Sequence, residues 1–147
     1  MPVHVSGPPP ELDAPPFDAE GFVHRAERLL MALDVSDAEL SISLVGDQVM
    51  AEMNQRFRGR EGPTDVLSFS LLEGEHAEHR GGMLGDVVLD LAVAGRQADS
   101  LGHSLDEELL RLLIHGALHL LGFDHELEKD ATVMEARERE LWAQLGN

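Results

Sequence analysis

Residues 109–125 read Leu-Leu-Arg-Leu-Leu-Ile-His-Gly-Ala-Leu-His-Leu-Leu-Gly-Phe-Asp-His, and this stretch decides the fold. At about 3.6 residues per turn, one narrow stripe of a helix carries the polar side chains, namely Glu108, Arg111, His115 and His119. Nearly every other position is Leu, Ile or Ala, so the helix is expected to be buried on most of its faces. The sequence therefore predicts one long core helix with a single polar line.

The histidines of this stretch have the spacing of metal ligands. His115 and His119 are one helical turn apart, which lets two imidazoles bind one small cation. Gly122 allows the chain to leave the helix through a left-handed residue, and the reversed chain can bring His125 to the same cation. Three neutral imidazoles leave a fourth position open, as in catalytic zinc sites. We therefore expect one zinc ion per chain, bound by His115, His119 and His125, rather than three hydrogen-bonded core histidines.

The spacing His-x-x-x-His-x-x-Gly-x-x-His is that of the metzincin proteases, with one difference. Those enzymes carry a glutamate directly after the first histidine as the general base, and here that position is Gly116. A metallopeptidase is therefore disfavoured, although another carboxylate can supply a base. Asp124, just before the third histidine, has three open roles: it can orient an imidazole, assist a water molecule or cap the turn. We include it among the candidate catalytic residues.

The composition limits the classes of partner. The net charge of −17 argues against a general binder of nucleic acids, because the field of the protein repels phosphates. There is one lysine, Lys129, so an anion site must be built from arginine. The dense arginine cluster is Arg56, Arg58 and Arg60; its spacing alone fits a solvated helix end slightly better than a binding site. The absence of cysteine excludes disulfides and thiolate metal sites.

The length of 147 residues predicts a single domain, 1–147, with a connector at residues 6–16 that contains five prolines. The first residues have neither the basic nor the apolar region of a signal peptide. Every apolar run is shorter than the roughly 18–20 residues of a membrane span. We expect a soluble, cytoplasmic protein without a membrane partner.

The remaining pattern predicts strands interleaved with helices around a small mixed sheet, which is an α+β fold. Strands are expected at 3–5, 40–44, 64–69 and 85–90. Helices are expected after Asp18, after Gly46-Asp47, from about 91 to 98, after the Ser104/Glu107 capping box and at 128–145. In the second helix, the inward residues are expected to be Val49, Met50, Met53 and Phe57.

Several polar residues are expected to lie on the surface. Residues 72–84 resemble a surface loop, so His76 and His79 are interpreted as non-ligands. His103 precedes the helix cap and is expected to face solvent. The Glu and Arg residues of helix 128–145 are expected to form mostly a solvated face, while Val133, Ala136, Leu141 and Leu145 pack inward.

Three blocks together resemble the YbeY family of bacterial endoribonucleases. Residues 115–125 look like the family signature; Asn54 with Phe57-Arg58-Gly59 and residues 63–69 resemble a second block, and Gly85-Asp86-Val87-Val88 a third. The similarity runs from about Leu40 to the last helix. Ser70 stands where the family often has proline, and the proline-rich connector is unusual.

The resemblance implies a metal-dependent, single-strand-specific endoribonuclease with roles in 16S rRNA 3′-end maturation and late-stage 70S ribosome quality control. By that similarity His115, His119 and His125 are the zinc ligands, and Arg58 is the functional arginine. The partners it implies are ribosomal RNA and the small ribosomal subunit or ribosomal proteins, with no DNA expected. The alternatives are a metal-containing ribosome-assembly factor without nuclease activity and a metallopeptidase-like hydrolase.

Metal-assisted cleavage of a phosphodiester is the mechanism expected from these residues. The cation would polarise a phosphoryl oxygen or lower the pKa of a bound water, and Arg58 would hold the phosphate through its planar fork. The nucleophile, either that water or the 2′-hydroxyl of RNA, is left open by the sequence.

Overall fold

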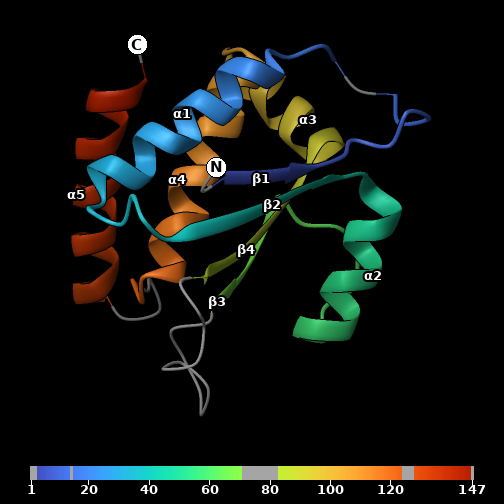
Figure 1. Ribbon diagram of the computed structural model, residues 1–147. Coiled ribbons are helices and arrows are strands. Elements are labelled where there is room, and N and C mark those ends of the chain that lie inside the picture. Colours follow the sequence, from blue (N-terminus) through green and yellow to red (C-terminus); the bar gives the residue numbers. More distant parts are fainter. Residues whose placement is uncertain (1–2, 14, 71–82, 124–127, 147) are drawn as a thin grey trace.

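The computed structural model describes residues 3–13, 15–70, 83–123 and 128–146. Within these ranges a mixed sheet is surrounded by helices (Figure 1). The strands are β1 (Val3–Ser6), β2 (Glu39–Val45), β3 (Val66–Ser70) and β4 (Met83–Asp90). The helices are α1 (Ala19–Ala32), α2 (Asp47–Arg58), α3 (Leu91–Leu101), α4 (Leu105–Leu120) and α5 (Glu128–Leu145).

The strand order in the sheet is β1-β2-β4-β3. β1 and β2 are parallel, with Val3 opposite Leu40, and β2 and β4 are parallel, with Ile42 opposite Val87. β3 is antiparallel to β4 and forms one edge of the sheet. The predicted α+β class with a small mixed sheet is confirmed.

The two faces of the sheet are covered by different helices. Alternate residues of β2 and β4, among them Ile42, Val87 and Leu89, belong to the main core together with α1 and α4. The residues of opposite parity, such as Val88 with Leu67 of β3, pack against Met50 of α2. Figure 1 shows α2 apart from the other helices, on its own side of the sheet. The alternation of side chains along a strand produces this division.

α4 is the central helix of the main core, as residues 109–125 predict. Eleven of its residues are buried, including Glu108, and it contacts the sheet, α1, α3 and α5. Leu109, Leu113, Ala117 and Leu118 are fully buried. Burying a leucine side chain contributes about 1.5–3 kcal/mol, so α4 supplies a large share of the hydrophobic stabilisation.

Most predicted elements are confirmed, with small shifts of their ends. Asp18 caps α1 by accepting from the backbone N–H of Gly21, and Gly59 ends α2 in the left-handed region with φ 66°. α3 continues to Leu101 instead of ending near residue 98. Residues 72–82 of the predicted loop, with His76 and His79, lie outside the described residues, and β4 begins at Met83.

Three apolar residues expected to face inward are exposed. Val49 and Phe57 of α2 are 43% and 48% exposed, because this short helix contacts the sheet mainly through Met50. The Phe57 ring instead packs edge-on against Phe69 of β3, with ring centroids 5.3 Å apart. In α5, Val133 is exposed and its neighbour Met134 is buried, in line with Leu141 and Leu145 on one helical face. Within the described ranges, none of the helices is both long and apolar enough to span a membrane.

Candidate active site

α4 holds the candidate ligands His115 and His119 on a well-defined helix. Ser104 caps it, with its hydroxyl accepting from the Glu107 N–H at 3.1 Å while the Glu107 carboxylate accepts from the Ser104 N–H at 3.1 Å. This reciprocal pair lowers the pKa of Glu107, chiefly through the hydrogen bond from the Ser104 backbone. The predicted capping box is confirmed, and it fixes the start of the helix whose later turns carry both histidines.

The two imidazoles converge on one point. The Nε2 atoms of His115 and His119 are 3.2 Å apart, and the ring centroids are 4.7 Å apart with the planes inclined by 74°. Tetrahedral zinc with Zn–N bonds of about 2.0–2.1 Å holds neighbouring nitrogens about 3.3 Å apart. Two nitrogen lone pairs this close repel unless a proton or a cation lies between them. The residues present therefore fit two ligands of one zinc ion.

Glu138 of α5 contacts the other nitrogen of His115. Its Oε2 atom lies 3.4 Å from His115 Nδ1, and both side chains are partly buried. A carboxylate there favours the tautomer with a proton on Nδ1, which leaves the Nε2 lone pair for a metal. The prediction that the acidic residues of α5 are mostly solvated missed this residue. The sequence pattern does indicate an inward position for Glu138, because it lies on the same helical face as Met134, Leu141 and Leu145.

Gly116 packs directly against the sheet. A Cβ atom at this position would lie 3.0 Å from Ser68 Oγ, 3.1 Å from Val87 Cγ1 and 3.2 Å from Val66 Cγ2. The Ser68 hydroxyl donates to the Gly116 carbonyl at 2.9 Å. A glutamate here would point into the sheet rather than toward the imidazoles, so this position cannot supply the metzincin base.

Arg58 of α2 contacts the edge strand β3. Its Nη2 donates to the Ser68 carbonyl at 2.7 Å, its Nη1 donates to the Phe57 carbonyl at 3.3 Å, and its guanidinium lies 5.0 Å from the centroid of the Phe69 ring. Ser68 is thus bonded to Arg58 through its carbonyl and to α4 through its hydroxyl. The structure connects Arg58 to the helix that bears His115 and His119.

The other two arginines of the cluster take different directions. The Arg56 guanidinium lies over the Phe57 ring, 5.3 Å from its centroid. Arg60 follows Gly59 and is therefore outside the helix. Of the three arginines, Arg58 is the one bonded to β3.

A buried ionic cluster begins the polar stripe of α4. Glu108 is fully buried and accepts from Arg111, and its Oε1 is 2.7 Å from His103 Nε2. Arg111 donates to the two carboxylate oxygens of Glu108 through Nε and Nη2, and these bonds raise the pKa of the Arg111 guanidinium. The prediction that His103 faces solvent was wrong: its side chain is 22% exposed, because the turn at Gly102 directs it onto Glu108.

Asp124 and His125 lie outside the described residues, so their predicted roles stay predictions. Among the residues that the structure describes, no three His, Asp or Glu side chains form a group that could hold a metal. Asn54, quoted in the resemblance, is buried and donates to the Gly62 carbonyl at 2.9 Å. Its role in this structure is to hold the turn after α2.

Comparisons with known proteins agree on one family. The model of the family described as "Endoribonuclease YbeY" matches residues 18–146. An endoribonuclease YbeY of Persephonella marina is 46% identical over 123 residues, covering 82% of this chain and 80% of that protein. The protein of the same name from Syntrophotalea carbinolica is 43% identical over 122 residues, covering 82% and 81% of the two chains.

A solved structure has a similar fold. The solution structure of TM1509 from Thermotoga maritima superposes with a TM-score of 0.57, covering 97% of this chain and 90% of that one at 25% sequence identity. The likeness therefore covers nearly the whole chain.

Proposed function

The chain belongs to the YbeY family of endoribonucleases, and we propose that it is a metal-dependent endoribonuclease that cleaves single-stranded RNA. The observation that carries this proposal is the convergence of two imidazole nitrogens 3.2 Å apart on α4, next to a residue bonded through Ser68 to Arg58. A paired-nitrogen ligand site, linked through β3 to an arginine, suits a phosphodiester.

His115 and His119 would hold the zinc ion, with His125 as the third ligand and one ion per chain. When bound, zinc supplies a Lewis acid for a phosphoryl oxygen and lowers the pKa of a bound water. Glu138 would orient the His115 ring and favour the tautomer whose Nε2 lone pair faces the metal. Asp124, adjacent to the third ligand, is retained as an auxiliary catalytic residue.

Arg58 would bind the scissile phosphate. The stacking on Phe69 and the bond to the Ser68 carbonyl hold its guanidinium plane in place. A planar fork held in advance can donate two parallel hydrogen bonds to a phosphate without losing further side-chain freedom. It would also offset the negative charge that develops during cleavage.

The biological roles we propose are 16S rRNA 3′-end maturation and late-stage 70S ribosome quality control in the cytoplasm. The net charge of −17 disfavours binding of free RNA at long range. A ribosomal protein with a basic surface would offset this repulsion and bring the candidate site to its substrate.

The packing of Gly116 against β3 counts against a metallopeptidase. One assay distinguishes a nuclease from an assembly factor that has no nuclease activity. Purified protein is incubated with matched single-stranded and duplex RNA, and zinc is measured on the same sample. The proposal predicts internal cleavage of the single strand that a chelator abolishes. Zinc-loaded protein that cleaves neither RNA would contradict it.

A further inference from the structure

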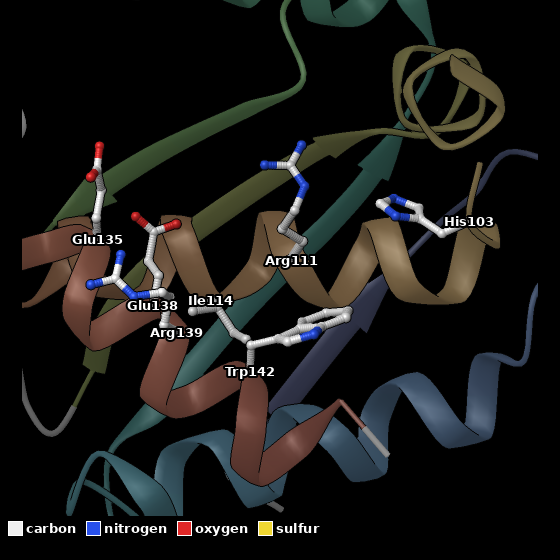
Figure 2. Close-up of a pocket in the computed structure, with 7 residues that line it drawn as sticks. All are labelled: His103, Arg111, Ile114, Glu135, Glu138, Arg139 and Trp142. Carbon is white, nitrogen blue, oxygen red and sulfur yellow. The ribbon is translucent and has the colours of Figure 1, made fainter. Parts of the chain in front are cut away.

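A cavity of about 500 Å³ lies between α4 and α5, beside the candidate site (Figure 2). Arg111 and Ile114 line it from α4, and α5 contributes Glu138, Arg139 and Trp142. His103 and Glu135 complete the lining. The volume is in the range of sites for small organic ligands, about 300–1,000 Å³.

The cavity adjoins His115. Ile114, which lines it, directly precedes His115, and Arg111 is one turn earlier on the polar stripe of α4. Glu138 is shared, because it lines the cavity and its Oε2 lies 3.4 Å from His115 Nδ1. A polymer bound at the candidate site therefore has a neighbouring compartment within reach of its next unit.

Trp142 offers an aromatic surface for stacking. It is the one tryptophan of the sequence and is partly buried. Gly146 packs against the ring, since a Cβ there would lie 3.0 Å from Trp142 Cε2. Figure 2 shows the indole beside α4 and Ile114, with the Arg111 side chain directed away from it. A ring fixed in this way stacks on a planar ligand at a small cost in side-chain entropy.

The charged groups around the indole include both signs. Arg111 is held by the fully buried Glu108 and is 42% exposed, so its guanidinium is a positioned donor. Arg139 is exposed and makes no hydrogen bond or ion pair within the part of the chain that the structure describes. Glu135 and Glu138 are acceptors, and they disfavour a ligand that is only an anion.

An aromatic wall, two arginines and two carboxylates suit a nucleotide, which has a planar base, hydrogen-bond donors and a phosphate. We propose that this cavity is a subsite for one nucleotide of the RNA strand, next to the phosphodiester that is cleaved. The base stacks on Trp142, the backbone phosphate binds Arg139 and Arg111, and Glu135 accepts from base or ribose. This inference rests on the proposed function and adds the residues that bind the strand beside the scissile bond.

Trp142 itself reports the binding, because all tryptophan emission comes from this residue. The probe is a 2′-O-methyl hexaadenylate with a fluorescent 3′ label, titrated into the metal-loaded protein and checked afterwards to be intact. Label anisotropy measures total binding and tryptophan emission measures stacking. The variants are Arg139→Gln and, as matched control, Arg137→Gln. Arg137 is on the same helix but bonds to Glu140 and the Ala32 carbonyl. A second pair, Trp142→Leu and Trp142→Phe, is assayed for RNA cleavage.

We expect the probe to quench the tryptophan emission of the wild-type protein. The Kd for the probe should rise at least about fivefold in Arg139→Gln and less than about twofold in Arg137→Gln. Trp142→Leu should raise KM at least about fivefold with little change in kcat, and Trp142→Phe should restore most of the loss. The subsite would be overturned if the protein cleaved and bound RNA but the probe did not quench the emission and the two arginine variants had equal Kd values. That result would leave the proposed function intact. A wild-type protein that neither binds nor cleaves RNA would overturn both. If Trp142→Leu does not fold, the arginine pair and the emission decide.

Discussion

The Ser68 hydroxyl lies 2.9 Å from the Gly116 carbonyl oxygen and joins the edge strand β3 to α4 one residue after His115. The Ser68 carbonyl accepts from Arg58 at 2.7 Å. One residue thus positions the candidate phosphate-binding arginine relative to the candidate metal helix. Because Gly116 has no side chain, the strand can approach α4 closely enough for the Ser68–Gly116 bond.

Gly116→Ala should destabilise the protein by about 1–3 kcal/mol, because the new Cβ would contact Ser68 and two valines of the sheet at 3.0–3.2 Å. The matched control is Gly95→Ala in α3, where a Cβ would meet only Pro15 at 3.4 Å. That change should be neutral or stabilising by up to about 1 kcal/mol, since alanine favours helix. Urea unfolding of both variants measures the difference. Equal effects of the two substitutions would show that the packing at Gly116 is not special.

Glu138→Gln should lower zinc affinity by about tenfold or more, because the amide no longer carries the charge that favours a proton on His115 Nδ1. Glu140→Gln is the control, since Glu140 pairs with Arg137 and its side chain is 63% exposed. Competition with a chromophoric chelator gives both affinities. Identical zinc affinities of the two variants would show that Glu138 does not support zinc binding.

His119→Ala should lose the bound ion entirely, whereas His76→Ala should retain about one ion per chain. Metal analysis of the purified variants tests this. Full retention of zinc without His119 would contradict the three-histidine site. Neither variant nor the wild type should cleave unstructured protein, because position 116 lacks the metzincin base.

Asp90 should contribute to the pH dependence of the free energy of unfolding. This carboxyl is fully buried and caps α3, and burial together with a hydrogen bond to Asp47 raises its pKa from 3.8 to about 7. Among the described residues Asp90 Oδ2 has no hydrogen-bond donor, which adds to the cost of ionising this buried carboxyl. The same hydrogen bond, with the one from Arg96, lowers the pKa of Asp47.

An acid whose pKa is raised by folding binds more protons in the folded than in the unfolded state between the two pKa values. The free energy of unfolding should therefore fall as pH rises from 3.8 to about 7. Asp90→Asn keeps the acceptor that caps α3 and removes the group that titrates. It should flatten this decline, as measured by urea unfolding at several pH values. An unchanged slope in Asp90→Asn would exclude Asp90 as its source.

The sequence predicts some of these features because they depend on neighbouring residues. The 3.6-residue period is enough to place Glu108, Arg111 and both histidines on one stripe of α4, and the capping box is local to Ser104 and Glu107. A small sheet packed with helices follows from the alternation of strands and helices. The antiparallel direction of β3 depends on contacts across the sheet, which no local pattern specifies.

Other features arise only in three dimensions. The contact of Glu138 with His115 spans 23 residues and joins two helices. The pattern of α5 places Glu138 on the inner helical face but does not identify its partner. Spacing left Arg56, Arg58 and Arg60 equivalent, and Arg58 was chosen by family resemblance. Its distinguishing contacts are made by β3, which explains why the cluster could not be resolved from its own sequence.

The most direct test of the central claim is the single-turnover cleavage rate of single-stranded RNA by Arg58→Lys, compared with Arg60→Lys. Lysine supplies a charge but neither the planar fork nor the stacking on Phe69. We predict a loss of at least about tenfold for Arg58→Lys, or about 1.4 kcal/mol of transition-state stabilisation, and almost none for Arg60→Lys. Zinc content should stay at the wild-type level in both. Equal rates for the two variants, or release of zinc from Arg58→Lys, would contradict the assignment of Arg58 to the scissile phosphate.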